Sequence, residues 1–468
     1  MPEPEAPETP PRQGGGPTLR EVLLHRGYLG LLLVAVLVGI PISLVAFGFV
    51  GLVHELQHWI WESLPDAAGF DRAPWWWPLP ALALAGLLLA PIVTRLPGRG
   101  GHVPVDGPGG GPSLPRDVPG VVLAALCCLP LGAVLGPEAP LMALGGGLAL
   151  LAVRAPTRAR NPRVVPVLGA AGASAAISTI FGSPLVAAVM MIEGAGLGGP
   201  QLVALILPCL LASGVGALVF TGFGHWTGLA VGALSLPHVP TTGTPDPGDF
   251  LWGVPLAVAV ALVCVTGQAL GRRVKAFTTG GPGGPGGPGV GPTARRTAVR
   301  TVGCAVAVGG CVAAYALLTG RSPEEAALSG QATLSALAAD PAAWPIGALL
   351  ALVLCKTLGW GIALGSLRGG PIFPAILIGG ALGVACAPLP GLGTAPALAA
   401  GLAASGAAVT KLPVTSTVLA AMLLGGQAAD AMPLLIVTAV TAFLTAELLR
   451  GRTGHARKAP APVPPDRP

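Results

Sequence analysis

An internal repeat built around prolines is the feature that most constrains how this chain can fold. Residues 135–148 read LGPEAPLMALGGGL, and residues 370–382 read GPIFPAILIGGAL. A second group of matches follows both segments at nearly the same offset, so two halves of the chain repeat each other in the same order. The matches are Gly136 with Gly370, Pro137 with Pro371, Pro140 with Pro374, 145–146 with 379–380, 170–172 with 399–401, Ala175 with Ala404, and Pro184 with Pro413.

Composition assigns this repeat to a membrane protein. Of the 468 residues, 52% are hydrophobic and 10% are charged, whereas soluble domains carry about 25% charged residues. In an apolar chain, segments interrupted by Gly and Pro at matching places of two halves indicate a transporter's binding site. Pro is favoured at the first helical position, where its missing N–H has no partner. Each GPxxP therefore predicts a half-helix that begins inside the membrane, with free N–H groups and a positive dipole end that favour an anion.

The two copies differ in charge, because the first carries Glu138 and the second carries Ile372. An ionisable side chain within the bilayer costs at least ~2.5–3.5 kcal/mol on insertion scales, so Glu138 is a functional candidate. Its carboxylate can occupy the place of an anion, and protonation would remove the charge and release the place. We predict that Glu138 is both the gate of an anion path and a proton carrier. The alternative is an acid that only caps backbone N–H groups.

Apolar segments that predict helices run from residue 27 to residue 449. Several are shorter than the ~20 residues that a full crossing needs, so half-spans and tilted helices are expected. The sequence thus predicts an all-α polytopic membrane protein with broken helices. The expected segments are 27–61, 78–96, 117–135, 138–153, 164–181, 184–196, 200–221, 250–271, 301–319, 344–365, 373–387, 395–410, 413–425 and 431–449.

The transmembrane domain is expected to have a polar segment at each end. We expect residues 1–22 to be a disordered cytoplasmic N-terminus, 23–450 to be the transmembrane domain, and 451–468 to be a basic, proline-rich cytoplasmic tail. Within the domain, the repeats cover about 78–225 and 300–450, with a Gly/Pro linker at 279–292.

Charge and cysteine usage restrict the function. Because the basic residues lie in short clusters between apolar segments, the net charge of +6 indicates membrane orientation and not nucleic-acid binding. The clusters fall on one side of the predicted topology, so both termini are expected in the cytoplasm of a multi-pass plasma-membrane protein. The eight cysteines form no CxxC pair and are expected to be small buried hydrophobic residues.

Residues 54–58, HELQH, match the HExxH motif, in which two histidines on one helix face bind zinc and the glutamate acts as a base. No later acid lies within an apolar segment as an obvious third ligand, and Trp59 and Trp61 indicate a membrane interface. We therefore expect a polar helix end, with no metal and no cofactor. The alternative is an intramembrane zinc metalloprotease that uses His54, Glu55 and His58.

Four further charged residues lie near the repeated segments. Glu193 ends the apolar run SPLVAAVMMIEG, either as an inner acid of a proton route or as an interfacial charge. Arg368, just before GGPIFP, could attract anions into a vestibule. Lys356 and Lys411 are expected to snorkel to the surface.

Taken together, these motifs resemble those of the CLC family of chloride channels and proton/chloride exchangers. GPEAP at 136–140 looks like the family's GREGP motif, which places Glu138 at the gating glutamate, and 369–383 looks like its GxFxP segment. GGHVP at 100–104 lies where the family has GSGIP, and the resemblance covers roughly residues 25–450. The family's paired helix starts are similar to 181–193 and 411–423.

The resemblance implies a CLC-type inverted repeat: a homodimer in the lipid bilayer, with antiparallel repeats and one pore per subunit. Anions would be held by main-chain amides where helix ends converge. The matching positions are Gly101, His102 and Ala139, together with Ile372 or Phe373, because matching by the prolines and matching by the Ile-Phe pair differ by one residue.

The sequence also departs from the family pattern. Gly101 replaces the family's pore serine, Gly194 replaces the second inner glutamate, and Tyr28 and Tyr315, the only tyrosines, do not match the late pore tyrosine. Both hydroxyl donors are therefore missing. We predict transport of chloride or similar anions, by a channel or a loosely coupled proton/chloride antiporter that is not an enzyme. The alternatives within the membrane class are a fluoride-handling CLC relative and a non-transporting scaffold.

Overall fold

The computed structural model describes residues 26–107, 113–153, 164–196, 199–227, 236, 245–279 and 294–455. Within these ranges every regular element is a helix, which confirms the all-α prediction. The predicted N-terminal segment 1–22, nearly all of the linker 279–292 and most of the tail 451–468 lie outside the described residues.

Each expected apolar segment contains a helix, and seven helical stretches of the described chain are long and apolar enough to cross a membrane. Six further apolar helices are shorter, in line with the expected half-spans. The longer helices are α2 (Arg26–His58), α4 (Pro78–Arg95), α9 (Gly199–Thr227), α10 (Pro247–Thr279), α11 (Ala294–Thr319), α13 (Ile346–Ser366) and α17 (Ala428–His455). The six shorter helices are α5 (Val118–Cys128), α6 (Glu138–Val153), α7 (Val164–Phe181), α8 (Pro184–Ala195), α14 (Ile372–Cys386) and α15 (Thr394–Thr410). The helix α16 (Pro413–Leu424) forms one long stretch together with α17.

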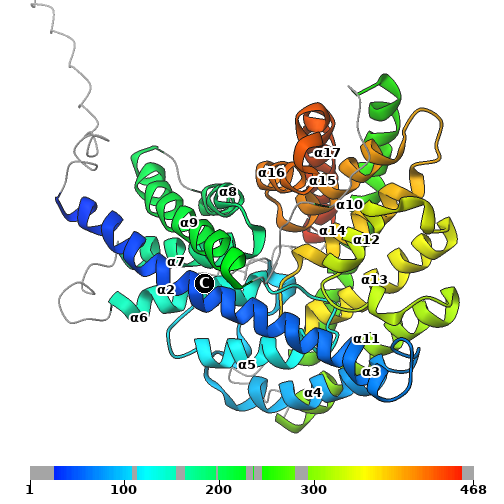
Figure 1. Ribbon diagram of the computed structural model, residues 1–468, viewed down its shortest axis with the longest axis horizontal. Coiled ribbons are helices and arrows are strands. Elements are labelled where there is room, and N and C mark those ends of the chain that lie inside the picture. Colours follow the sequence, from blue (N-terminus) through cyan, green and yellow to red (C-terminus); the bar gives the residue numbers. More distant parts are fainter. Residues whose placement is uncertain are drawn as a thin grey trace, which may run out of the picture.

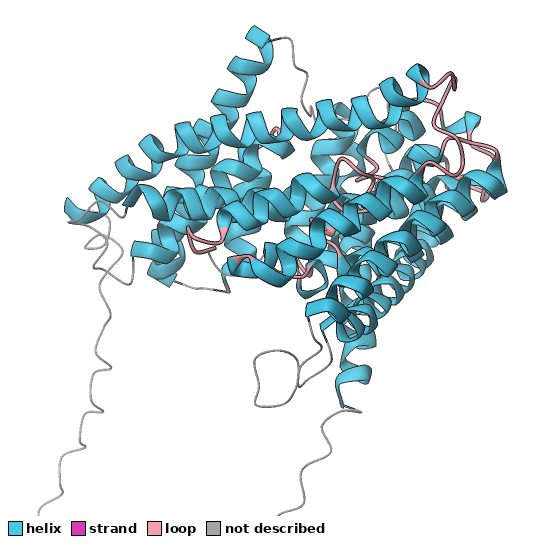
Figure 2. Cartoon of the chain, turned by 90° about the horizontal axis from the view of Figure 1, so that it is seen from below, coloured by secondary structure: helices cyan, strands magenta, loops and turns pink. Residues whose placement is uncertain are grey.

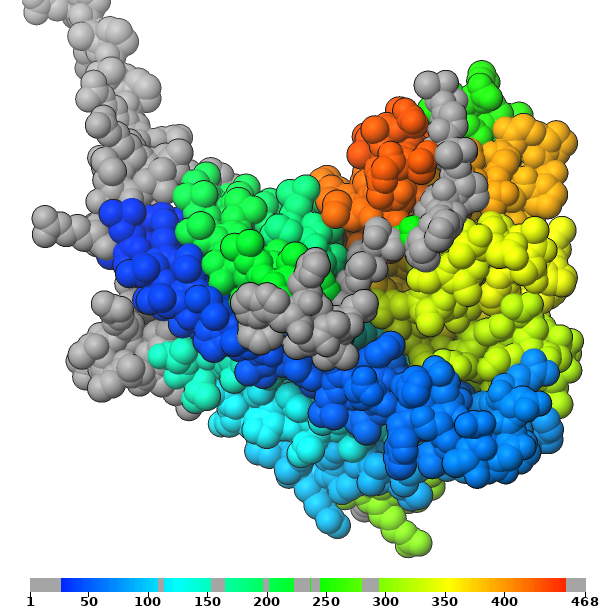
Figure 3. Space-filling view, viewed as in Figure 1, coloured from blue at the N-terminus to red at the C-terminus, as the bar shows by residue number. Residues whose placement is uncertain are grey.

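The helices of the two halves gather on two sides of the molecule. In Figure 1, α6 to α9 lie on the left and α13 to α17 lie on the right, while α2 runs diagonally across the front. Figure 2 shows loops that run among the helices. In the space-filling view, α2 forms a blue band beside the green α9, with which it packs (Figure 3).

A close glycine contact repeats in the two halves. A Cβ built on Gly145 of α6 would lie 2.2 Å from the carbonyl oxygen of Gly172 in α7. A Cβ built on Gly379 of α14 would likewise lie 2.2 Å from the carbonyl oxygen of Gly401 in α15. Only glycine permits backbones to approach this closely. Since these residues match in the sequence repeat, the same helix crossing forms twice.

The predicted segment 117–135 is not one continuous span. Helix α5 ends at Cys128, and the chain then turns through Pro130 and Gly132, whose φ is +103°. A Cβ on Gly132 would lie 2.5 Å from the ring of Trp61, and the indole N–H of Trp61 donates to the carbonyl of Pro130 (3.0 Å). Glycine and proline therefore end the helix and let the turn pack under a buried tryptophan.

The helix α12 (Gln331–Ala339) was not predicted from the sequence. It lies between α11 and α13, and its polar residues gave no signal of a membrane helix. A π-helical turn, η1 (Trp59–Ser63), continues α2 and leads into α3 (Leu64–Ala67).

Candidate functional site

The two proline-rich segments meet at Gly136 and Gly370. The N–H of Gly136 donates to the carbonyl of Gly370 (2.8 Å), and the N–H of Gly370 donates to the carbonyl of Gly136 (2.5 Å). Matching residues that pair reciprocally lie on the two-fold axis that relates the repeats, as in an isologous contact. The contact therefore brings the starts of α6 and α14 to one place.

Glu138, the first residue of α6, is fully buried and contacts the N-terminus of α14. Its Oε1 accepts a hydrogen bond from the backbone N–H of Ile372 (2.5 Å). The backbone N–H groups of Glu138 itself and of Phe373 also face the carboxylate. Oε2 has no hydrogen-bond partner among the described residues. The carboxylate thus occupies a position where free helix N–H groups and a positive dipole end favour an anion.

The glycines next to this carboxylate are required by space. A Cβ built on Gly136 would lie 2.0 Å from Oε2 of Glu138, and one built on Gly370 would lie 2.1 Å from its Cδ. Any larger residue would occupy the position of the carboxylate. The local sequence therefore permits a charged group to pack directly against the partner segment's backbone.

Both second-repeat candidates contribute to the site, in different ways. The N–H of Ile372 makes the hydrogen bond to Glu138, whereas the ring of Phe373 packs against the ring of Phe181 with centroids 5.6 Å apart. Ala139 is buried in the first turn of α6. The two matches left open by the sequence thus correspond to neighbouring positions of the same helix start.

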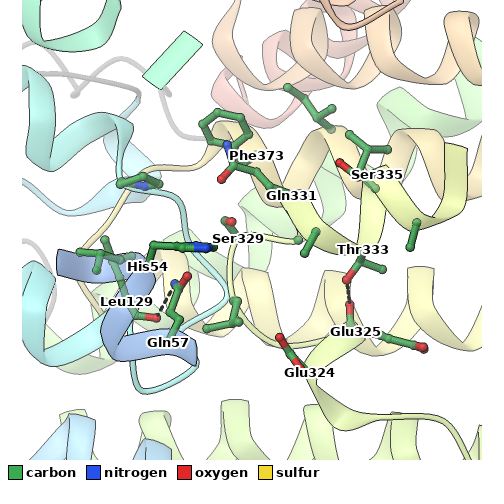
Figure 4. A pocket seen from close by; sticks show the side chains of 18 of the residues that line it. His54, Gln57, Leu129, Glu324, Glu325, Ser329, Gln331, Thr333, Ser335 and Phe373 are labelled. Carbon is green, nitrogen blue, oxygen red and sulfur yellow. Dashed lines mark hydrogen bonds between the residues drawn. The ribbon is translucent and has the colours of Figure 1, made fainter. Parts of the chain in front are cut away.

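A cavity of about 1100 Å³ adjoins this helix start, and Pro137 and Phe373 belong to its lining. Its walls come from α2, the turn after α5, the end of α7 and the α12 region. Figure 4 shows Gln57 bonded to the carbonyl of Leu129 on one wall and Thr333 bonded to the carbonyl of Glu325 on the other. The cavity therefore leads to the residues that flank the buried carboxylate.

Charged side chains also line the cavity. His58 pairs with Glu62 (3.4 Å), and Nε of Arg321 donates to Glu325 (2.8 Å). Burial raises the pKa of Glu324, and the negative charges of Glu62 and Glu325 raise it further, while His58 opposes them. These groups line the cavity with side chains of both charge signs.

Lys356 does not snorkel to the surface, which corrects the prediction. Its side chain is fully buried in α13, and Nζ donates to the carbonyls of residues 326–328 at 3.0, 2.9 and 3.4 Å. These three acceptors match the three N–H groups of an ammonium and offset part of its burial cost. The loop leads into α12, so Lys356 supports one wall of the cavity. Lys411 is exposed, as predicted.

The candidate anion-site residues Gly101 and His102 lie in the turn between α4 and α5. Gly101 has a φ of +94°, and Nε2 of His102 lies 2.9 Å from the carbonyl oxygen of Gly107. The imidazole thus contacts its own loop. The turn is joined to the second repeat by Arg368, whose Nε–H donates to the carbonyl of Arg99 (3.3 Å).

Glu193, at the end of α8, caps the N-terminus of α16. Its Oε1 accepts from the N–H of Val414 (2.9 Å), and its Oε2 accepts from the N–H and the hydroxyl of Thr415 (both 2.7 Å). The matching helix α8 is capped by its own Ser183, whereas Leu412 at the N-cap of α16 offers no side-chain acceptor. Glu193 supplies that cap from the other repeat.

Three residues of the HELQH segment, His54, Gln57 and His58, line the cavity. Gln57 and His58 bond to the carbonyl of Leu129 and to Glu62, respectively. In the part of the chain that the structure describes, no group of three His, Cys, Asp or Glu side chains is arranged to hold a metal ion. The segment therefore serves as a polar wall of the cavity, and the zinc-protease alternative is not favoured.

Sequence reasoning missed the wall residues from α7 and α12. Thr179 and Ile180 line the cavity just before Gly182, whose φ of +58° separates α7 from α8. The FGSP break at this point was an available signal for a helix end at the site. Gln331 and Thr333 lie in a short, mixed-polarity stretch whose position at the cavity depends on tertiary packing.

A family model described as "Voltage gated chloride channel" matches residues 99–447 of this chain. The putative ion-transport protein YfeO of Escherichia coli O139:H28 (strain E24377A / ETEC) is 28% identical over 375 residues, which cover 77% of this chain and 81% of that protein. YfeO of Shigella boydii serotype 4 (strain Sb227) is 29% identical over 371 residues, with the same coverage.

Solved structures share the fold. A slow cyanobacterial Cl⁻/H⁺ antiporter superposes with a TM-score of 0.68 and 18% identity, covering 92% of this chain and 99% of that chain. A CLC-type fluoride/proton antiporter gives a TM-score of 0.65 and 17% identity, covering 91% and 97%. At these identities the likeness concerns the fold, and it confirms the predicted architecture.

Proposed function

This chain belongs to the family of voltage gated chloride channels, the CLC family, and from that premise we propose that it moves chloride or similar anions across a membrane. It does so as a channel or as a loosely coupled proton/chloride antiporter, and it catalyses no chemical reaction. The proposal includes a homodimer in the plasma membrane with both termini in the cytoplasm.

The observation that carries the proposal is the contact between Glu138 and the N–H of Ile372 at the meeting point of the two repeats. A fully buried carboxylate held by helix N–H groups occupies a position equally suited to a halide. A transported anion would compete with Glu138 for the N–H groups of Ile372, Phe373 and Ala139. The turn at Gly101 and His102 would complete the path on one side.

Protonation couples the gate to pH. A neutral carboxyl group loses the charge-assisted bond to the Ile372 N–H, which is roughly twice as strong as a neutral bond. Glu138 can then leave the helix N-termini to an anion and carry a proton as it moves. Glu193, the candidate for an inner proton route, is bonded to the start of α16, which favours a structural role and loose coupling.

The test records chloride and proton movement together from liposomes that contain the purified full chain. We expect Glu138→Gln to change the chloride rate and to abolish proton movement, because the amide cannot carry a proton. Glu55→Gln, which removes an exposed acid on α2, is the matched control and should resemble the wild type.

The results of these measurements distinguish among the alternative functions. Unchanged chloride and proton movement in Glu138→Gln would count against the role of Glu138. Chloride movement that cannot drive protons uphill would identify a channel. Replacing internal chloride with fluoride tests the fluoride alternative, which predicts faster loss of fluoride than of chloride. A wild type that moves no anion under any of these conditions would favour the scaffold alternative.

A further inference from the structure

Arg368 is a buried arginine close in sequence to the candidate site. It lies in the segment between α13 and α14 and is 9% exposed. One residue, Gly369, separates it from Gly370 along the chain, so the two Cα atoms are at most ~7 Å apart. Gly370 in turn packs directly against the carboxyl group of Glu138. The backbone of Arg368 therefore lies close to the backbone that forms the candidate site.

The side chain of Arg368 is fixed between two segments. Its Cγ lies 3.6 Å from the position of a Cβ on Gly100, in the turn before α5. Nε donates to the carbonyl of Arg99 (3.3 Å), and Nη1 donates to the carbonyl of Leu367 (3.0 Å). Two sides of the guanidinium are thus held, one by each segment, and the group is preorganised.

The remaining nitrogen, Nη2, is left with free donors. A guanidinium has five N–H groups, and no described residue accepts a hydrogen bond from Nη2 of Arg368. The fully enclosed side-chain atoms without a partner are, in the described ranges, Glu138 Oε2, Thr357 Oγ1 and Trp360 Nε1. Nη2 is not one of these atoms, so it is not fully enclosed by the protein.

No carboxylate in the described ranges forms an ion pair with Arg368. Asp106, whose negative charge acts on the guanidinium without forming an ion pair with it, is bonded to Lys275 at 2.6 Å. A buried charge without an ionic partner is costly, and a bound anion would offset that cost. Both the positive charge and the free N–H groups therefore favour the binding of an anion.

We propose that Nη2 of Arg368 binds the transported anion on the Gly101 side of Glu138. This inference rests on the proposed function and adds a specificity-determining residue to it. Guanidinium N–H groups make strong charge-assisted bonds to small anions. Arg368 thereby supplies the side-chain donors that Gly101, in place of a serine, cannot provide.

The experiment measures the initial rate of chloride flux against chloride concentration in liposomes, and chloride binding in detergent by calorimetry. We expect Arg368→Gln to raise the chloride KM and Kd at least about tenfold, the loss of one charge-assisted hydrogen bond, with a smaller change in kcat. Arg368→Lys keeps the charge but loses the planar fork, so KM should rise by less. Arg95→Gln, an exposed arginine at the end of α4, should leave KM unchanged.

A purely structural role of Arg368 predicts different changes in melting temperature, kcat and KM. If Arg368 only holds the turn before α5, both variants melt at lower temperature and lose kcat while KM stays at the wild-type value, which would overturn the inference. If Arg368→Gln does not fold, the KM of Arg368→Lys decides by the same criterion. A wild type without anion flux would overturn the proposed function itself, whereas normal wild-type flux with unchanged KM in the variants overturns only the role of Arg368.

Discussion

Gly136 and Gly370 bond to each other through both backbone N–H groups and both carbonyls, although they lie in opposite halves of the sequence. This contact determines how closely the starts of α6 and α14 approach. It also leaves room for the carboxyl group of Glu138, which occupies the space that side chains at these two positions would take. The position of Glu138, the proposed gate, thus depends on two residues that have no side chain.

Gly370→Ala should therefore destabilise the protein. Its Cβ would lie 2.1 Å from Cδ of Glu138, so the carboxyl group must be displaced or the helix starts must separate, at a cost of roughly 2 kcal/mol or more. Thermal unfolding in detergent should show a lower melting temperature. Gly347→Ala is the control: nothing lies within 4 Å of its Cβ position in α13, and helix propensity favours alanine by about 1 kcal/mol. Equal melting temperatures for the two variants would contradict this account.

Lys356→Met should be strongly destabilising. The variant leaves the carbonyls of residues 326–328 without their buried donor, and unsatisfied buried groups cost about 1–3 kcal/mol each. Because this loop forms part of the cavity wall, anion flux should fall as well. The measurements are melting temperature and liposome flux. Lys411→Met, at an exposed ion pair with Glu447, should change stability by less than about 1 kcal/mol. A tolerated Lys356→Met would show that the loop does not need the ammonium.

Glu193→Ala should loosen the start of α16. The variant removes all three hydrogen bonds to residues 414–415, and loss of a helix cap costs roughly 0.5–2 kcal/mol. Glu193→Gln keeps acceptor capacity, so it should be destabilised less and should keep the wild-type ratio of proton to chloride movement. Loss of proton movement in Glu193→Gln, at unchanged melting temperature, would instead assign this residue to a proton route.

Glu324→Gln should stabilise the protein at neutral pH. The raised pKa of Glu324, caused by burial and by the charges of Glu62 and Glu325, means that the folded state binds the proton more tightly than the unfolded chain. Its contribution to stability therefore falls as pH rises from the ordinary pKa of 4.5 through the raised value. The melting temperature of the variant should exceed that of the wild type at pH 7, and the difference should shrink toward pH 4.5.

The control for this prediction is Glu55→Gln, an exposed acid on α2. A pH-independent difference between Glu324→Gln and the wild type would show that the effect arises from packing rather than from titration.

The repeat allowed the sequence to predict much of this arrangement. Gly136 and Gly370 match in sequence and also touch, because matching residues near a two-fold axis are neighbours. The helix starts at Glu138 and Ile372 followed from the prolines before them. Local signals of this kind are sufficient to predict the structure of a short segment whose own residues determine it.

Contacts between distant segments could not be predicted in this way. Lys356 was expected at the surface because nothing in its own helix shows the carbonyls of residues 326–328 that accept its N–H groups. The bond from Arg368 to the carbonyl of Arg99 likewise joins segments far apart in sequence. Such pairings depend on how the two halves pack, which helix periodicity does not specify.

The most direct test of the central claim is a bromide soak of crystals of Glu138→Ala and of the wild type, with anomalous scattering recorded from both. The claim is that an anion and the Glu138 carboxylate share one place at the start of α14. We predict a bromide peak within hydrogen-bond distance of the Ile372 N–H in the variant, and a weaker peak or none there in the wild type. Bromide bound elsewhere in the variant, with none at the Ile372 N–H, would contradict the claim.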